Sequence, residues 1–425
     1  MNLNRKHITV FEHQALRLNQ EIEGVKFSAN HLKALQGYFG EKGVPYYSLI
    51  HNGVRFNEHV GVIQVGETII EVLPKADNAA DSPNQKAKWR DILIDMLFAV
   101  DAFQIHSPSS SSLKLKPNSI LDLYFEIFVR EVEYLLRTGL IKRYRKKEGN
   151  VTALKGNLKF NKHIQQNHVH QERFYTSHSI YDVQHTLHCI LYKTIRLLKQ
   201  INTDAGLHSR LGALSLHFPE MPDMKVSEAT FQKISYSRKN QQYKTSIEIA
   251  KLILLKYHPD IRLGKDNVLA LMFDMNNLWE KFVYASLRKF IRHPSTITAQ
   301  TTKSFWKPDE GYRSKIRPDI VVNNNSLNCT VLDTKWKNLN GYNPSPDDLR
   351  QMYVYHQYYD AHKVALIYPG TKTLKAVGKY LDPVTGKESD KECSIVSIGI
   401  ESDMKAWQKS IYSELSSWLG HPKAP

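Results

Sequence analysis

The sequence has few cysteines, no long apolar run and no phosphate-binding loop, and each absence excludes a class of protein. Its three cysteines, Cys189, Cys329 and Cys393, lie far apart, which excludes a disulfide framework and a cysteine-based zinc site. No stretch approaches the roughly 18 uninterrupted apolar residues of a membrane helix. Residues 1–7 carry charge without a following apolar run. We therefore expect no membrane span, no secretion signal and a location in the reducing cytoplasm.

Acidic residues are too few to balance the basic ones. The chain carries 58 Lys and Arg against 42 Asp and Glu, a net charge of +16. An excess of this size attracts polyanions, most often nucleic acid, although a protein that is merely basic stays open on composition alone. Hydrophobic residues make up 41% of the 425, which excludes disorder over most of the chain. At ~100–200 residues per domain, this length predicts two to four domains.

The patterning predicts a mixed α/β protein with three domains. Residues 1–80 are expected to form a small β-rich domain, because apolar runs flank tight-turn signals at Asn52-Gly53 and Gly66-Glu67. The small, polar segment 76–87 is typical of a linker. A mainly helical domain is expected over residues 88–265 and an α/β domain over residues 266–425. Helical periodicity in the middle domain covers residues 89–103, 119–137, 187–201 and 247–257.

Two features of the middle region are open to more than one interpretation. The basic run 142–147 contains Tyr144 and could bind phosphates, but a solvated run of charges is an equal alternative. His185 and His188 are spaced so that a helix could offer both to zinc. No Cys pattern or HExxH motif accompanies them, which favours a non-metal role. No GxxxxGK[ST] loop occurs, so we expect no nucleotide hydrolysis by this chain itself.

The residues that carry chemistry lie between 317 and 336. Two β-patterned runs, 317–322 and 331–336, flank an Asn-rich turn and predict a hairpin. Side chains alternate along a strand, so Asp333 and Lys335 share one face, and the pairing can bring Asp319 beside them. Adjacent carboxylates suit Mg²⁺, which takes oxygen ligands and keeps several waters. We therefore predict Asp319 and Asp333 as metal ligands and Lys335 as a group that orients water or offsets phosphorane charge.

Flanking elements extend this pattern. A predicted upstream helix over 272–290 carries Glu280, which could reach the same site. Downstream, Ser345-Pro346 with an acid at 348 is a strong helix start. That helix carries Gln351 and Tyr355, which lie on one face at i, i+4. With an apolar strand over 364–368, the order helix, strand, strand, helix, strand predicts a nuclease-like core.

These residues resemble a known family. Pro318-Asp319 followed by Asp333-Thr334-Lys335 is similar to the PD-(D/E)xK signature of restriction-endonuclease-like enzymes, and Gln351 to Tyr355 resembles their QxxxY element. Over residue 88 to the C-terminus, the chain more narrowly resembles McrC, the nuclease subunit family of McrBC modification-dependent restriction systems. The segments that support this resemblance are 89–97, 154–160, 185–193 and 279–368.

The resemblance implies a restriction-endonuclease-like C-terminal core that uses Mg²⁺ to cleave DNA containing modified cytosine. Catalysis would fall to Asp319, Asp333 and Lys335, with Gln351 and Tyr355 in the QxxxY element. The resemblance also implies that the middle region docks on an McrB-like AAA+ GTPase ring and stimulates its GTP hydrolysis.

The sequence departs from the family at two positions and leaves two other readings open. His185 and Cys189 stand where the family usually has Asp and Asn, and residues 1–80 are an addition that some members lack. One alternative is a stand-alone QxxxY-type nuclease in repair or phage defence. The other is a non-catalytic DNA-binding scaffold. The residues by themselves indicate a Mg²⁺-dependent phosphodiesterase that acts on DNA.

Overall fold

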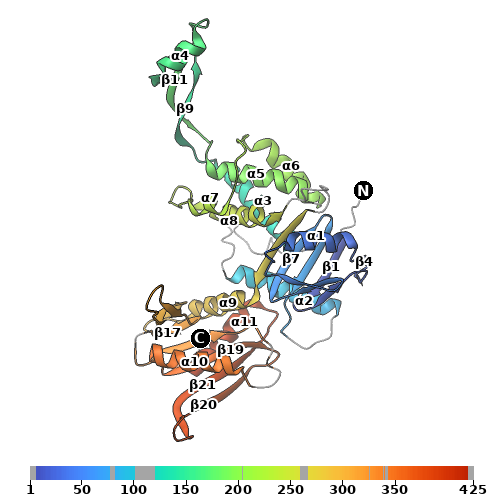
Figure 1. Cartoon of the computed structure of the whole chain (residues 1–425), viewed down its shortest axis with the longest axis vertical. Helices are drawn as coiled ribbons and strands as arrows, with labels where there is room; N and C mark the ends of the chain where they lie inside the picture. The colour runs from blue at the N-terminus through green and yellow to red at the C-terminus, as the bar shows by residue number, and fades with distance from the viewer. Residues whose placement is uncertain are drawn as a thin grey trace. The chain divides into compact units, whose positions relative to one another are not determined.

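The computed structural model describes residues 6–76, 82–100, 120–202, 204–258, 267–324, 326–337, 339 and 343–419. The chain is a mixed α/β protein that folds as two compact units (Figure 1). The middle unit lies within residues 104–271. The second unit, called the discontinuous unit below, combines residues 6–103 with residues 272–425.

The N-terminal part of the discontinuous unit contains both predicted hairpins. β5 (Tyr47–Ile50) pairs with β6 (Gly53–Phe56), and β7 (His59–Val65) pairs with β8 (Thr68–Leu73), each antiparallel. Gly53 is required at the start of β6 because a Cβ there would lie 2.4 Å from the backbone oxygen of Leu16 in the neighbouring strand β2. The other elements are β1 (Lys6–Phe11), which is parallel to β8, β2 (Ala15–Arg17), β3 (Glu21–Ile22), β4 (Val25–Lys26) and α1 (Ala29–Phe39).

The C-terminal part of this unit has the predicted order of helix, two strands, helix and strand. These elements are α9 (Met275–Phe290), β17 (Ile320–Val322), β18 (Thr330–Thr334), α10 (Pro346–Tyr359) and β19 (Lys363–Gly370). β17 and β18 are antiparallel and β18 and β19 are parallel, which confirms the predicted hairpin and buried strand. The sheet is completed by β14 (Ile297–Ala299) beside β17, and by β21 (Glu388–Gly399) and β20 (Leu374–Leu381) beyond β19. α11 (Met404–Leu419) packs on α9.

Helix α10 covers one face of this sheet, and the side chain of Asp333, a predicted catalytic residue on β18, lies on that face. Met352 and Tyr355 of α10 lie in one buried cluster with Val331 of β18 and Leu366 of β19. Asp333 stands opposite Leu366 in the register of β18 and β19. Because paired residues point to the same side of a sheet, Asp333 points towards α10.

The two parts of the discontinuous unit share one core. The Trp336 indole Nε1–H donates a hydrogen bond of 2.8 Å to Glu12 Oε1, although 324 positions separate them. The Trp336 ring also lies 6.4 Å from the ring of Trp89 and 5.7 Å from that of Trp279, both edge-on. The N-terminal β structure therefore packs directly beside the residue that follows Lys335.

Helix α2 (Pro83–Ala99) joins this shared core instead of the middle region. Ser82 caps it by accepting a hydrogen bond from Gln85 N, and α2 packs against β8, α9 and α11. The helix therefore begins inside the segment that was predicted as a linker, of which residues 77–81 lie outside the described part. The expected boundaries at 80 and 88 thus do not coincide with the compact units.

The middle unit contains three of the four helices predicted for the middle domain, because the fourth is α2, and one unpredicted sheet. Its helices are α3 (Ile120–Thr138), α5 (Thr186–Ile201), α6 (Ala205–His217), α7 (Glu228–Gln232) and α8 (Lys244–Lys256). α3 ends at Gly139, which has a φ of 91°, as the sequence predicted. The predicted cap at Ser119 lies outside the described residues.

The unpredicted sheet forms an arm that extends away from these helices (Figure 1). The arm consists of β9 (Arg143–Val151), β10 (Asn157–Leu158), α4 (Phe160–Asn167) and β11 (Phe174–Asp182), with β11 between β10 and β9. The basic run 142–147 lies mostly on β9, whose side chains are largely exposed. In the described part of the chain, no helix is both long and apolar enough to cross a membrane.

Candidate active site

The β17–β18 hairpin brings together the three residues predicted to carry catalysis. Asp319 immediately precedes β17, Asp333 lies in β18 and Lys335 follows β18 directly. Asp333 is 2% exposed, whereas Asp319 is half-buried. Lys335 Nζ lies 2.7 Å from Asp333 Oδ2. The predicted juxtaposition of two carboxylates and one ammonium is therefore present in the structure.

The Asp319 carboxylate is held by Thr334. Alternation along β18 would place the Thr334 side chain on the face opposite Asp333 and Lys335. One Asp319 oxygen, Oδ2, accepts hydrogen bonds from both the backbone N and the side-chain Oγ1 of Thr334, each 2.7 Å long. This is possible because Asp319 precedes the paired part of β17 and is not bound to the alternation of the strand. Thr334 therefore fixes the orientation of this carboxylate.

Glu280 on α9 is connected to Asp319 by Gln300, a residue that the sequence did not identify as part of the site. The side chain of Gln300, which follows β14, donates a hydrogen bond of 2.7 Å to Glu280 Oε1. The backbone N of Gln300 donates to the carbonyl oxygen of Asp319 at 2.9 Å. Gln300 therefore links Glu280 to Asp319. The pairing of β14 with β17, a contact distant in sequence, is what places it there.

Helix α10 supplies the predicted QxxxY residues and one further acid. Gln351 Oε1 accepts a hydrogen bond of 3.2 Å from Lys335 Nζ, and Gln351 Nε2 donates one of 2.8 Å to the Tyr355 hydroxyl. Tyr355 is itself buried beneath the helix. Asp348, predicted only as part of the helix start, lies 3.8 Å from Lys335 Nζ and 3.2 Å from Lys337 Nζ. The sequence did contain one sign that Asp348 belongs to this cluster, namely its position one helical turn before Gln351.

The site raises the pKa of three of its acids, Asp319, Asp333 and Glu280. Burial, and then the nearby Asp319, raises the pKa of Asp333 to about 7. Burial likewise raises the pKa of Asp319, and burial followed by repulsion from Asp319 raises that of Glu280. Burial alone would lower the pKa of Lys335, but Asp333 more than offsets it, so the pKa of Lys335 lies above its usual value. The ammonium therefore stays protonated at neutral pH.

The donor set of this cluster fits Mg²⁺ better than a transition metal. Asp333 Oδ2 is a buried carboxylate oxygen that forms an ion pair with Lys335 Nζ at 2.7 Å and receives no hydrogen bond of good geometry from any described group. Within the described ranges, no three His, Cys, Asp or Glu side chains converge closely enough to hold a metal ion. Mg²⁺ is commonly held by only one or two carboxylates and completes its octahedron with water and substrate oxygens. Asp319 and Asp333 are the residues of the cluster that could supply oxygen ligands to such an ion.

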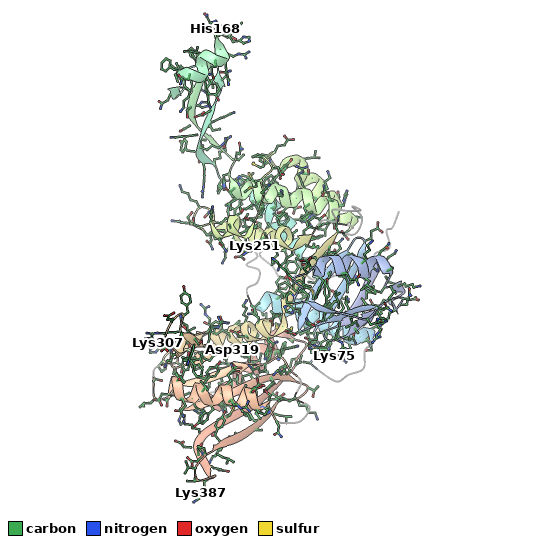
Figure 2. The ribbon with its side chains drawn as sticks, in the orientation of Figure 1. Lys75, His168, Lys251, Lys307, Asp319 and Lys387 are labelled. Atoms are coloured by element: carbon green, nitrogen blue, oxygen red, sulfur yellow. The ribbon has the colours of Figure 1, made fainter. Side chains whose placement is uncertain are left out.

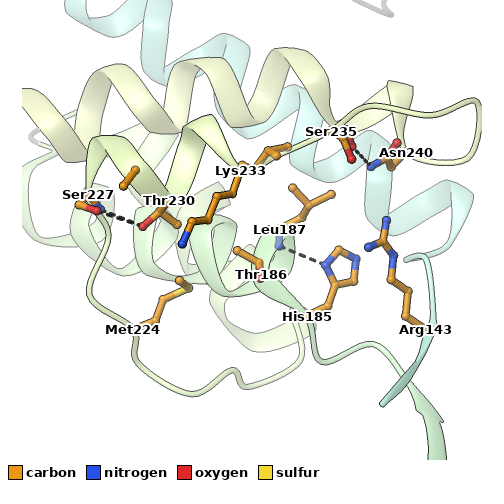
Figure 3. Close-up of a pocket in the computed structure, with 12 residues that line it drawn as sticks. Arg143, His185, Thr186, Leu187, Met224, Ser227, Thr230, Lys233, Ser235 and Asn240 are labelled. Carbon is orange, nitrogen blue, oxygen red and sulfur yellow. Dashed lines mark hydrogen bonds between the residues drawn. The ribbon is translucent and has the colours of Figure 1, made fainter. Parts of the chain in front are cut away.

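A separate pocket of about 440 Å³ lies in the middle unit and contains none of the predicted catalytic residues (Figure 3). Arg143 and Lys233 line it, together with hydroxyl groups and His185, and no Asp or Glu is among its lining residues. A pocket without a carboxylate or a pair of metal ligands has no means of holding Mg²⁺. It is therefore not the candidate hydrolytic site.

His185 in this pocket explains one departure from the family pattern. Its Nδ1 accepts a hydrogen bond of 3.2 Å from Leu187 N, so it caps α5, a role for which Asp is a preferred residue. Burial, and then the neighbouring His188 and Arg143, lowers the pKa of His185 to about 4. Both ring nitrogens of His188 are engaged, with the carbonyl oxygen of Val183 and the hydroxyl of Tyr243. The two histidines thus serve the local fold.

The fold and the site together define a mixed α/β protein with two carboxylates and a lysine gathered at one hairpin of a central sheet. A family model described as the McrBC 5-methylcytosine restriction system component matches residues 54–369. The chain therefore belongs to the McrBC family.

Two solved structures from Thermococcus gammatolerans resemble the chain. One is a refined half-complex from a tetradecameric assembly of McrB AAA+ hexamers with bound McrC. It matches with a TM-score of 0.72 and 19% identity, over 97% of this chain and all of that chain. The other is a cryo-EM structure of the McrBC complex, with a TM-score of 0.48 and 17% identity, over 67% of this chain and 88% of that chain. At these identities the first likeness shows the fold. No curated protein matches the chain significantly.

Proposed function

We propose that this chain is the Mg²⁺-dependent DNA endonuclease subunit of an McrBC-like restriction system. The observation that carries the proposal is the convergence of Asp319, Asp333 and Lys335 on a hairpin of a nuclease-like core. Family membership supports a role in restriction of DNA that contains 5-methylcytosine. The net charge of +16 supports a polyanionic substrate.

The chemistry assigned to each residue follows from its contacts. Mg²⁺ held by Asp319 and Asp333 would polarise a phosphodiester oxygen and lower the pKa of a bound water. Lys335, which stays protonated, orients the attacking water or stabilises the charge that develops on the phosphorane. Gln351 directs the Lys335 ammonium through its carbonyl oxygen and is held in turn by Tyr355. Thr334 holds Asp319 in place.

The partner in this proposal is an AAA+ GTPase of the McrB type. The solved chain of similar fold comes from a complex of McrB AAA+ hexamers with bound McrC. We assign the partner contact to the middle unit, whose arm carries exposed apolar side chains that a partner could cover. These are Tyr144, Leu154, Phe160, Ile164, Val169 and Tyr181. Binding there would stimulate GTP hydrolysis by the partner.

The test is cleavage of a methylated supercoiled plasmid with Mg²⁺, with and without the candidate GTPase and GTP. Asp333→Ala should abolish cleavage while leaving GTPase stimulation intact, because it removes a proposed metal ligand from a strand far along the chain from the arm. The matched control is Asp347→Asn, which alters an exposed acid on α10 and should cleave normally.

The outcomes separate the alternatives. Unchanged cleavage by Asp333→Ala would rule out the proposed metal site. Full cleavage without the GTPase would favour a stand-alone nuclease. DNA binding without cleavage under any condition would favour a non-catalytic scaffold.

A further inference from the structure

A small hairpin projects from the chain segments that hold the carboxylate cluster. β15 (Lys303–Trp306) and β16 (Ser314–Ile316) form a two-stranded sheet of their own. Gln300, which bonds to both Glu280 and Asp319, lies just before β15. Asp319 itself follows shortly after β16. Both ends of the β15–β16 hairpin are therefore fixed at the candidate active site. Figure 2 labels Asp319 at this site and Lys307, which lies between β15 and β16.

The hairpin is also fastened to helix α10. Lys303 Nζ donates a hydrogen bond of 2.8 Å to the carbonyl oxygen of Tyr358, and the Tyr358 hydroxyl donates one of 3.3 Å to the carbonyl oxygen of Phe305. The rings of Phe305 and Tyr358 lie 5.5 Å apart. A register shift between Ser304 and Trp306 marks a bulge, a feature that re-aims side chains next to active sites.

The far part of the hairpin carries exposed rings and unpaired cations. Trp306 is 58% exposed and Tyr312 is 98% exposed, and neither has a ring partner among the described residues. Lys307, Arg313 and Lys315 form no ion pair with any carboxylate in the described part of the chain. Large exposed rings among free cations are the combination that proteins use to bind nucleic acid, by stacking on bases and by neutralising phosphates.

We propose that the β15–β16 hairpin is a DNA-binding element of the nuclease. Trp306 and Tyr312 insert between base steps of duplex DNA beside the phosphate to be cleaved and partly unstack them, while Lys307, Arg313 and Lys315 contact neighbouring phosphates. This inference rests on the proposed function, because it takes the adjoining carboxylates as the cleavage site. Stacking accepts every base, so the hairpin supplies affinity and positions the DNA without reading its sequence.

The test measures DNA affinity in the full-length protein, with Asp333→Asn as the parent so that no cleavage occurs. A fluorescent methylated duplex is titrated at several salt concentrations. The aromatic variant is Trp306→Ala with Tyr312→Ala, and the charge variant is Lys307→Gln with Arg313→Gln and Lys315→Gln. The control is Leu381→Ala with Val384→Ala, two exposed side chains at the opposite edge strand of the same unit and the turn that follows it.

The aromatic variant should bind about 10- to 100-fold more weakly with little change in salt dependence. The charge variant should lower the slope of log K against log salt by about 2 to 3, because each lost phosphate contact removes about 0.9. The control should bind like the parent. All variants should keep the melting temperature of the parent, since the altered side chains are exposed.

Several results would overturn the hairpin assignment. Parent-like affinity and salt slope in both variants would do so, as would a parent that binds no DNA. Retained DNA binding with lost association to the AAA+ GTPase would make the hairpin a protein contact instead. Weakened DNA binding in the variants would support the hairpin even if the unmodified chain cleaved no DNA. That last case would remove only the proposed nuclease function.

Discussion

Asp333 is the residue at which burial and charge conflict most strongly. Its folded pKa of about 7 lies well above the value of roughly 4 expected in an unfolded chain. Between these two values the folded state keeps a proton that the unfolded state releases. The free energy of unfolding therefore falls as pH rises from about 4 to about 7, and the full cost is present above pH 7. The free-energy cost of ionising Asp333 in the folded protein is at most about 4 kcal/mol.

Removing this carboxylate should stabilise the protein at the pH where it is ionised. Without Mg²⁺, Asp333→Asn should raise the melting temperature by several degrees at pH 8, and the gain should vanish near pH 4. Added Mg²⁺ should raise the melting temperature of the unmodified protein at pH 8 and have little effect on the variant. Calorimetry across this pH range tests both statements. The exposed Asp347→Asn serves as control, and identical pH profiles for all three proteins would contradict the cost assigned to Asp333.

Lys335 should matter for the reaction more than for metal binding. As a protonated ammonium it has no lone pair to give to Mg²⁺, and its bonds reach Asp333 and Gln351. Lys335→Ala should slow cleavage by about 10²–10³-fold. At pH 8 it should leave Mg²⁺ affinity within a few-fold and GTPase stimulation unchanged. Paired assays of plasmid cleavage and phosphate release on one preparation check this. Loss of both activities in a folded variant would contradict the separate roles of the two units.

Among secondary-structure elements, those with a clear apolar run or a clear helix start were predicted from the sequence. The paired strands of the β17–β18 hairpin are mostly apolar and buried throughout. Helix α10 begins at a Ser-Pro-Asp-Asp signal that the structure confirms in detail, with Ser345 accepting from Asp348 N. These local patterns were enough to predict Asp319, Asp333 and Lys335 as neighbours, and the family resemblance added the QxxxY pair. Their bonding was not predictable, because it depends on how distant segments pack.

The strands of the arm gave no such pattern. β9 of the arm is largely exposed and strongly charged, and β11 is mostly half-buried with polar and aromatic residues, so neither sequence shows a clear apolar–polar alternation. The start of α2 was missed for another reason. Ser82-Pro83 is the same start signal as in α10, but the polar residues before it favoured a linker. Gln300 was hidden because it reaches Glu280 only through the pairing of β14 with β17.

At the scale of the whole molecule, residues 6–76 are part of the unit that carries the catalytic cluster. The sequence had presented residues 1–80 as an addition that some family members lack. The solved chain of similar fold covers 97% of this one, so most of this segment belongs to the shared architecture. Glu12 is buried and accepts hydrogen bonds from Lys75 N at 2.8 Å and from Trp336, the residue after Lys335. The N-terminal part therefore supports the end of β18, the strand that carries Asp333.

Deleting residues 1–80 should consequently abolish cleavage by destabilising the discontinuous unit. The deletion would expose Trp336 and α2 to water and remove the acceptor of the indole N–H, which costs free energy when a buried polar group loses its partner. Shortening the arm is the matched control, because it alters only the middle unit. That variant should keep the Mg²⁺-dependent rise in melting temperature but lose GTPase stimulation. Thermal unfolding with and without Mg²⁺ distinguishes the two. A truncated chain that folds, is stabilised by Mg²⁺ and still cleaves would show that the catalytic core stands without its N-terminal part.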